Sequence, residues 1–174
     1  MNVVNINEDG ALKLIKNIQH LDERGLFAEL YRANTFAHIG IIDTFVQDNY
    51  AQSYKNVLRG LHYQLPPYAQ SKLIFLLAGH IFDAAIDLRA DSFYYGKVYS
   101  VYLQPGEAIY VPAGFAHGYA ALEDAIIYYK CGNYYNPEAE AGIYYNDPAL
   151  AINWPLSRPI VSAKDKAWPL LKKQ

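Results

Sequence analysis

The sequence predicts a mainly β fold, a sandwich or barrel with a few short helices. Short runs rich in β-branched and aromatic residues recur at regular spacing, and turns that contain glycine or proline separate them. Tyrosine is unusually frequent, at 17 of 174 residues. A tyrosine ring suits a strand with one wet face, because the ring is buried while the hydroxyl reaches water.

Five runs are interpreted as strands: residues 72–77, 80–88, 97–103, 108–111 and 125–131. The first two are expected to form a β-hairpin, because Gly79 between them can adopt positive φ in the turn. Helical signals are sparse. Residues 34–40 could form a short helix, and residues 162–168 begin with a serine that could cap one or two turns. No linker or repeat interrupts the chain, so a single domain over residues 1–174 is expected.

The composition is that of a compact protein without a basic nucleic-acid surface. Hydrophobic residues make up 52% and charged residues 18%, and the net charge is −2. A small phosphate site remains possible, because it needs only a few cations. No apolar run approaches the roughly 20 residues that span a bilayer, and the first ten residues do not resemble a signal peptide. With Cys131 as the single cysteine, no internal disulfide can form, and a cytoplasmic location without membrane contact is expected.

Residues 106–117 read Gly-Glu-Ala-Ile-Tyr-Val-Pro-Ala-Gly-Phe-Ala-His, which resembles the second motif of the cupin superfamily. Gly106 and Gly114 would allow tight turns at both ends of a short strand, and His117 would then point into a barrel. The first cupin motif should supply two histidines and a glutamate as metal ligands. Here that region reads His62-Tyr63-Gln64, and no glutamate follows for many residues, so we expect no metal site. The polar groups inside the barrel would then serve acid–base chemistry or ligand binding.

Each candidate site residue also has a plainer interpretation. An isolated histidine such as His62 is more often a hydrogen-bonded core residue, but Arg59 and Lys72 nearby favour a functional role. Lys72 alone could be a solvated lysine at a strand end, and Tyr129 could be a packing residue of its strand. In a regular strand, positions 59 and 62 would face opposite sides of the sheet, unless a bulge at Gly60 intervenes.

Several segments in the same order resemble the dTDP-4-dehydrorhamnose 3,5-epimerase family, from about Leu21 to Asp165. They are residues 22–29, 45–49, 57–64, 69–73, 82–89, 111–118, 134–138 and 146–155. The resemblance implies a homodimer of double-stranded β-helices (a cupin or jelly-roll barrel). It also implies that the protein binds a nucleotide-linked 4-keto sugar and uses no metal or organic cofactor.

The resemblance also implies roles for individual residues. His62 matches the general base, Asp165 its carboxylate partner, Tyr129 the proton donor on the opposite sugar face, and Lys72 the cation beside the C4 oxygen. Further positions match residues that hold the sugar and diphosphate: Arg24, Glu29, Gln47, Asn49, Arg59, His117 and Glu140. Tyr135 matches an aromatic residue that stacks on the nucleobase. These types suit the chemistry, because a C4 ketone acidifies the hydrogens at C3 and C5 and inversion needs a base and an acid.

The leading hypothesis is an isomerase that converts dTDP-4-dehydro-6-deoxy-D-glucose to dTDP-4-dehydro-L-rhamnose. Departures from the family pattern concern recognition rather than catalysis: residues 130–133 read Lys-Cys-Gly-Asn, where typical members carry threonines. One alternative is therefore an epimerase that inverts only C3 or only C5 of a CDP-, GDP- or dTDP-linked deoxy-4-keto sugar. Another is a cupin that binds a sugar nucleotide without turning it over.

Overall fold

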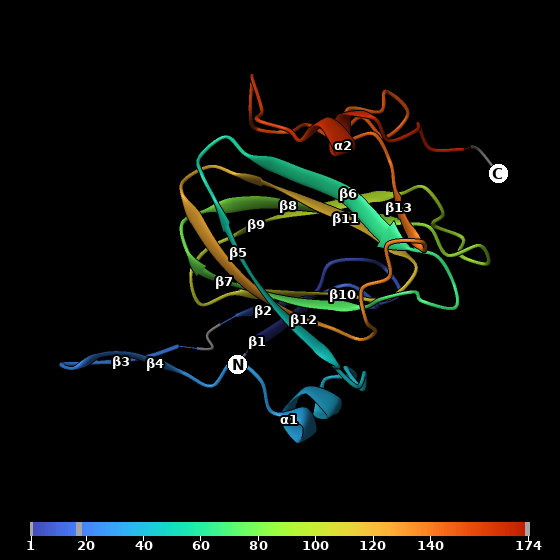
Figure 1. The fold of residues 1–174 in the computed structure, drawn as a ribbon. Coiled ribbons are helices and arrows are strands. Elements are labelled where there is room, and N and C mark those ends of the chain that lie inside the picture. Colours follow the sequence, from blue (N-terminus) through green and yellow to red (C-terminus); the bar gives the residue numbers. More distant parts are fainter. Residues whose placement is uncertain (1, 17–18, 173–174) are drawn as a thin grey trace.

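The computed structural model describes residues 2–16 and 19–172, and the two larger of its three sheets face each other as a barrel (Figure 1). The six-stranded sheet contains, in spatial order, β1 (Asn2–Asn5), β2 (Lys13–Lys16), β10 (Ala108–Val111), β7 (Lys72–Ala78), β12 (Ala125–Cys131) and β5 (Gln47–Ser53). The five-stranded sheet contains β13 (Glu140–Gly142), β6 (Leu58–Gln64), β11 (Phe115–Ala121), β8 (Ile81–Asp87) and β9 (Val98–Leu103). The arrangement confirms the predicted jelly-roll barrel of the cupin type.

The predicted hairpin between the strands on either side of Gly79 is wrong. β7 pairs with β10 and β12, whereas β8 pairs with β9 and β11, so the two strands belong to different sheets. Gly79 does adopt positive φ, at +85°, but its turn carries the chain from one sheet to the other. A Cβ at this position would lie 2.3 Å from the backbone oxygen of Asp124, so the close crossing requires glycine.

The two predicted helices are present and cover opposite sides of the barrel (Figure 1). Helix α1 (Ala33–His38) packs Phe36 against Phe75 on the outer face of the six-stranded sheet. Helix α2 (Ala163–Lys166) lies beside β6 on the other side, and the Ser162 hydroxyl caps it by accepting from the Asp165 amide at 3.0 Å. The serine cap was predicted from the sequence.

The barrel interior is apolar at one end and polar at the other. Its core joins side chains from both sheets: Leu14, Ile74, Leu76, Ile81, Ala85, Tyr99, Leu103, Ile109, Phe115 and Ile127. Burying these side chains is the main stabilising contribution, at about 25 cal/mol per Å² of apolar surface removed from water. The same strands carry polar side chains further along the interior face, so the core supports the walls of a polar cavity.

Candidate active site

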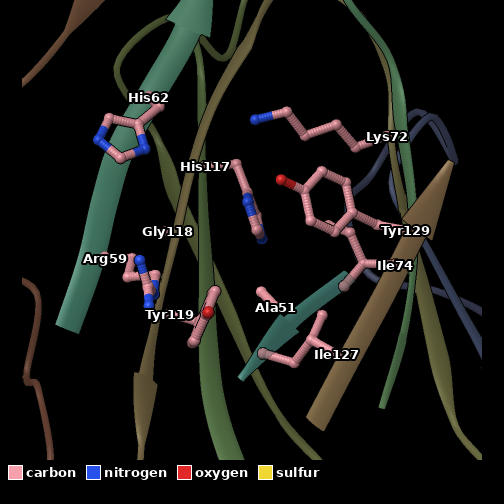
Figure 2. A pocket seen from close by; sticks show the side chains of 10 residues that line it. All are labelled: Ala51, Arg59, His62, Lys72, Ile74, His117, Gly118, Tyr119, Ile127 and Tyr129. Carbon is pink, nitrogen blue, oxygen red and sulfur yellow. The ribbon is translucent and has the colours of Figure 1, made fainter. Parts of the chain in front are cut away.

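The polar end of the barrel contains two adjoining cavities of about 200 and 240 Å³. They share His62, Lys72 and Tyr129 as lining residues. Figure 2 shows the first cavity, with His62 entering from β6 on one side and the Lys72 and Tyr129 side chains from the other. The cavity therefore lies between the two sheets, with side chains of each sheet on its walls.

A bulge at Gly60 places Arg59 and His62 on the same cavity. His117 of β11 pairs with His62, but Tyr119, two residues further, pairs with Arg59, so β6 contributes one extra residue. Gly60 has φ of +128° at this point. The sequence left the regular strand and the bulge open as alternatives, and the structure contains the bulge.

His62 is hydrogen-bonded to Asp165 across the junction of β6 and α2. The Nε2 atom of His62 lies 2.7 Å from Oδ1 of Asp165, and the second carboxylate oxygen accepts from the Gly60 amide at 3.3 Å. Burial lowers the pKa of His62 from its ordinary value of 6.5, and the bond to Asp165 opposes this only in part. The imidazole is therefore neutral at pH 7, and Asp165 accepts the Nε2 proton, which leaves Nδ1 as the basic nitrogen.

Lys72 and Tyr129 lie on the opposite wall, on neighbouring strands. Burial lowers the pKa of the Lys72 ammonium, while the Cys131 sulfur, Glu140 and Asp83 oppose that shift. Burial raises the pKa of the Tyr129 phenol above 10.0, so this hydroxyl keeps its proton at neutral pH. This wall thus offers a hydrogen-bond donor from each side chain to a group bound in the cavity.

His117 forms a second histidine–carboxylate pair in the cavity wall. The cupin-like motif predicted that this side chain would point into the barrel. Its Nε2 atom lies 2.8 Å from Oδ2 of Asp83, and the Asp83 side chain is fully buried. Asp83 was not among the residues predicted from the sequence. One signal could have found it: a lone carboxylate within the otherwise apolar run of residues 81–86.

Arg59 is held beside the cavity by the hydroxyls of Ser53 and Tyr119, which were likewise not predicted. Its Nε atom donates to the Ser53 hydroxyl at 2.9 Å, and that hydroxyl lies 2.9 Å from the hydroxyl of Tyr119. The guanidinium also donates to the backbone oxygen of Gln52 at 3.2 Å. Nothing in the local sequence links these positions, because they lie on three different strands.

The second cavity brings together four further predicted binding residues: Gln47, Asn49, Tyr135 and Glu140. The Tyr135 hydroxyl donates to Glu140 Oε2 at 2.5 Å, and Lys164 forms an ion pair with the same oxygen at 2.5 Å. Asn49 donates to the Cys131 sulfur at 3.4 Å. Tyr135 is half exposed at the mouth of this cavity, so a flat ligand could reach its ring.

Arg24 and Glu29 are the two predicted binding residues that the described chain does not bring to the cavity. Arg24 lies in the hairpin of β3 (Gln19–Asp22) and β4 (Gly25–Ala28), which projects away from the barrel (Figure 1). Its side chain is 84% exposed and pairs with Asp22 at 2.5 Å. Glu29 follows β4 and pairs with Arg32.

We also searched the described residues, 2–16 and 19–172, for a metal site and for a membrane-spanning helix. These ranges contain no group of three or more histidine, cysteine, aspartate or glutamate side chains arranged to hold a metal ion. The metal-free reaction itself stays a prediction. Within the same ranges, no helix is long and apolar enough to cross a membrane.

The fold and the site define the class of protein: a cupin-type barrel with a histidine–aspartate pair, a tyrosine and a lysine around one cavity. The model of the dTDP-4-dehydrorhamnose 3,5-epimerase family matches residues 9–173. The chain belongs to this family and is an epimerase of the isomerase class.

Individual relatives agree with this assignment. A dTDP-4-dehydrorhamnose 3,5-epimerase of Salmonella typhimurium is 47% identical over 155 residues, which are 86% of this chain and 85% of the relative. A dTDP-6-deoxy-D-glucose-3,5-epimerase from Legionella pneumophila, solved with dTDP-4-keto-L-rhamnose, superposes with a TM-score of 0.91 at 44% identity. That alignment covers 97% of this chain and 92% of the other. A 3′-monoepimerase from Streptomyces bikiniensis, solved with dTDP-quinovose, is also similar, at 28% identity, a TM-score of 0.87, and coverage of 98% and 87%.

Proposed function

We propose that this protein converts dTDP-4-dehydro-6-deoxy-D-glucose to dTDP-4-dehydro-L-rhamnose by inverting C3 and C5, without a metal or an organic cofactor. The observation that carries the proposal is the arrangement of His62 with Asp165 on one side of the cavity and Tyr129 with Lys72 on the other. Inversion of a carbon requires that a proton leave one face and another arrive at the opposite face. A base and an acid on facing walls meet that requirement.

In the first half of the reaction, Nδ1 of His62 takes the proton from C3 or C5. The electron pair of the broken C–H bond moves into a C–C double bond, and the C4 carbonyl oxygen becomes an enolate. Asp165 stabilises the imidazolium that forms, as the aspartate of a catalytic triad does. Lys72 donates a hydrogen bond to the enolate oxygen, the role of an oxyanion-hole donor.

In the second half, the Tyr129 hydroxyl gives its proton to the same carbon from the opposite face. The electron pair of the enolate forms the new C–H bond, and the C4 ketone is restored. The Tyr129 phenolate and the His62 imidazolium then regain their starting states by exchange with water. The raised pKa of Tyr129 keeps it protonated before each turnover, and the lowered pKa of His62 keeps it a free base.

The remaining cavity residues are proposed to hold the nucleotide and the sugar. Arg59 offers a planar fork of donors that suits a diphosphate, and Ser53 and Tyr119 restrain it beside the cavity. Tyr135 would stack on the base, with Gln47, Asn49, His117 and Glu140 as polar partners. These residues line the two cavities around His62, which supports one continuous substrate site.

Inversion of a single centre is the second candidate, because a 3′-monoepimerase shares the fold over almost the whole chain. Solvent deuterium exchange distinguishes the candidates. The purified protein is incubated in D₂O with dTDP-4-dehydro-6-deoxy-D-glucose, and the positions of label are read by NMR. Label at both C3 and C5 of an inverted product supports the proposal, label at one carbon supports the second candidate, and no label indicates binding alone.

Two variants test the roles of the acid and the base in the same assay. His62→Ala should abolish exchange at both carbons. Tyr129→Phe should still permit proton removal by His62, so exchange persists while completed inversion is impaired. Normal turnover by His62→Ala would contradict the mechanism, and equal loss of exchange in both variants would contradict the division of roles.

We also propose that the protein is a cytoplasmic homodimer in which the hairpin of β3 and β4 reaches the cavity of the partner subunit. The hairpin exposes apolar side chains, with Leu21 at 78% and Phe27 at 69% exposure. An isolated two-stranded hairpin is marginally stable in water, so a packing partner is expected. Arg24 at its turn would then supply a cation to the second site. In the cytoplasm, the buried thiol of Cys131 stays reduced.

A mixing experiment tests this arrangement. Arg24→Ala and His62→Ala are prepared separately, each with low activity, and then combined under conditions that exchange subunits. If Arg24 acts across the interface, the mixed dimer contains one site with both wild-type residues, and activity returns. If Arg24 acts within its own chain, no activity returns; if it does not act at all, Arg24→Ala alone keeps wild-type activity. Sedimentation analysis independently reports whether the protein is a dimer.

A further inference from the structure

Trp168 lies beside His62, on the same face of the sheet but outside the two cavities. The two rings meet edge to face, with 6.3 Å between centroids and 71° between planes. Trp168 lines neither of the two cavities that contain His62. It lines instead a groove at the edge of the sheet beside β13, together with Tyr63, Gly142 and the tail that follows α2. The indole therefore contacts the proposed base from the β13 edge of the sheet, next to the two cavities.

The contact depends on a glycine beside His62. Gly142 of β13 pairs with His62 of β6 in the sheet register. A Cβ on Gly142 would lie 2.5 Å from the indole of Trp168, so the ring rests directly on the backbone of this strand. Any larger side chain at position 142 would displace the indole from His62.

Trp168 and Asp165 lie on one anchored segment. The Ser162 hydroxyl caps the turn that carries Asp165, and the Pro169 oxygen accepts from the Tyr144 amide at 2.8 Å. The Leu171 amide donates to Asp147 Oδ2 at 2.6 Å. Because both ends of the segment are held, its two contacts with His62 are fixed together: the Asp165 carboxylate accepts a hydrogen bond from the ring, and Trp168 packs against it as an aromatic neighbour.

We propose that Trp168 is a positioning residue that excludes water from the side of His62 next to β13 and keeps its ring aligned with Asp165. The inference deepens the proposed function, because it concerns the base of that reaction. A ring that can tilt would present Nδ1 to the sugar carbon in the wrong direction, and small misplacements of reacting groups are costly. The indole N–H bonds to no atom of the described chain, so the contact is made by the ring itself.

Other groups around His62 act on its ionisation from every side. Asp165 of α2 and Glu140 of β13 favour the charged ring, whereas Lys72 of β7 disfavours it. His117 of β11, Tyr129 of β12 and Arg59 of β6 also face the same cavity. Truncation of Trp168 leaves all of these groups in place and changes the hydration of the ring. Since burial is the main cause of the lowered pKa of His62, its pKa should then rise.

The first test follows the five histidines by NMR as a function of pH in the ligand-free protein, with His62 assigned from a His62→Asn variant. In Trp168→Ala, the His62 midpoint should rise toward or above 6.5, while Trp168→Phe should keep most of the wild-type value. The matched control is Trp154→Ala, which removes the other tryptophan. Trp154 packs on Phe82, on the outer face of the five-stranded sheet, and has no ring contact with His62, so it should leave the midpoint unchanged. An unshifted midpoint in Trp168→Ala, or an equal shift in Trp154→Ala, overturns the inference.

The second test is kinetic. Trp168→Ala should lower kcat roughly 10- to 100-fold, with KM within about threefold of wild type. The acid limb of its pH–rate profile should move to higher pH. Gly142→Ala should reproduce both effects with the indole still present, which covers the case in which Trp168→Ala does not fold. If wild type fails to turn over the proposed substrate, the proposed function fails while the NMR titration still decides the inference. If wild type is active and neither variant alters kcat or the acid limb, the inference fails alone.

Discussion

Gly60 and Gly118 lie against each other on neighbouring strands: a Cβ on Gly60 would be 2.5 Å from the Cα of Gly118. A Cβ on Gly118 would in turn be 3.0 Å from the Cα of Gly60 and 2.6 Å from the Arg59 oxygen. This pair permits the bulge that turns Arg59 and His62 to the same cavity. Two residues without side chains thus determine the position of two functional side chains.

Gly60→Ala should therefore destabilise the fold, by roughly 3–5 kcal/mol in the free energy of unfolding, because positive φ and a backbone clash coincide. Urea denaturation measures the loss. Gly25→Ala is the matched control, since Gly25 has a similar φ of +122° but a Cβ added there would meet no atom within 4 Å. It should cost only roughly 1–2 kcal/mol. Equal losses in the two variants would argue against the clash.

The pH profile of kcat/KM should have its acid limb below 6.5. His62 acts as a base only when neutral, and burial lowers its pKa, so activity is retained at pH 7 and lost as the pH falls through the lowered pKa. The basic limb should belong to Lys72, whose pKa is lowered from 10.5, rather than to Tyr129, whose pKa is raised from 10.0. Exchange assays with Tyr129→Phe should thus keep the basic limb; its disappearance would assign that limb to the tyrosine.

Asp165→Asn should lower kcat by roughly 10²- to 10⁴-fold, because the amide no longer favours the tautomer with Nδ1 free or stabilises imidazolium. The pKa of His62 should also fall further, since Asp165 raises it in the wild type. The acid limb then moves to lower pH, opposite to the shift expected for Trp168→Ala. A kcat profile from pH 4 to pH 8 on both variants measures the two directions, and shifts of the same sign would contradict this account.

Lys72→Met should reduce kcat by roughly 10²- to 10³-fold, the usual cost of removing one oxyanion-hole donor. Methionine keeps most of the volume and leaves the buried wall apolar. The pKa of His62 should rise, because Lys72 lowers it in the wild type. Lys130→Met is a suitable control: this lysine pairs with Asp48 and lies on the outer face of β12, so kcat should stay near the wild-type value. Unchanged kcat in Lys72→Met would remove the lysine from the mechanism.

Local sequence patterns predicted the class of fold and all five of the strands they addressed. The turns at Gly106 and Gly114 were also correct, with φ of +89° and +88° around β10. The pairing of β7 and β8 was wrong because turn chemistry reports a change of direction and not the partner of a strand. That partner is chosen by long-range contacts with β10, β11 and β12.

The candidate site was predictable where residue type and motif agreed, and incomplete where the partner was distant in sequence. His62, Lys72, Tyr129 and Asp165 all meet at the predicted site. Asp83 and Trp168 were missed, because a buried carboxylate or indole acquires a role only from the side chain against which it packs. Arg24 and Glu29 lie outside the cavity of the described chain, and only a second copy can test them.

The hydrogen bond between His62 and Asp165 joins residues 103 positions apart, and the second partner comes from the segment that closes over the barrel last. On the ribosome, a nascent chain presents its basic imidazole long before the carboxylate that directs it has been synthesised. The strands of the described chain all precede Asp165 in the order of synthesis, so the proposed acid–base pair is among the last parts to be completed. Residues 162–171 complete the proposed acid–base pair only when they pack beside β6.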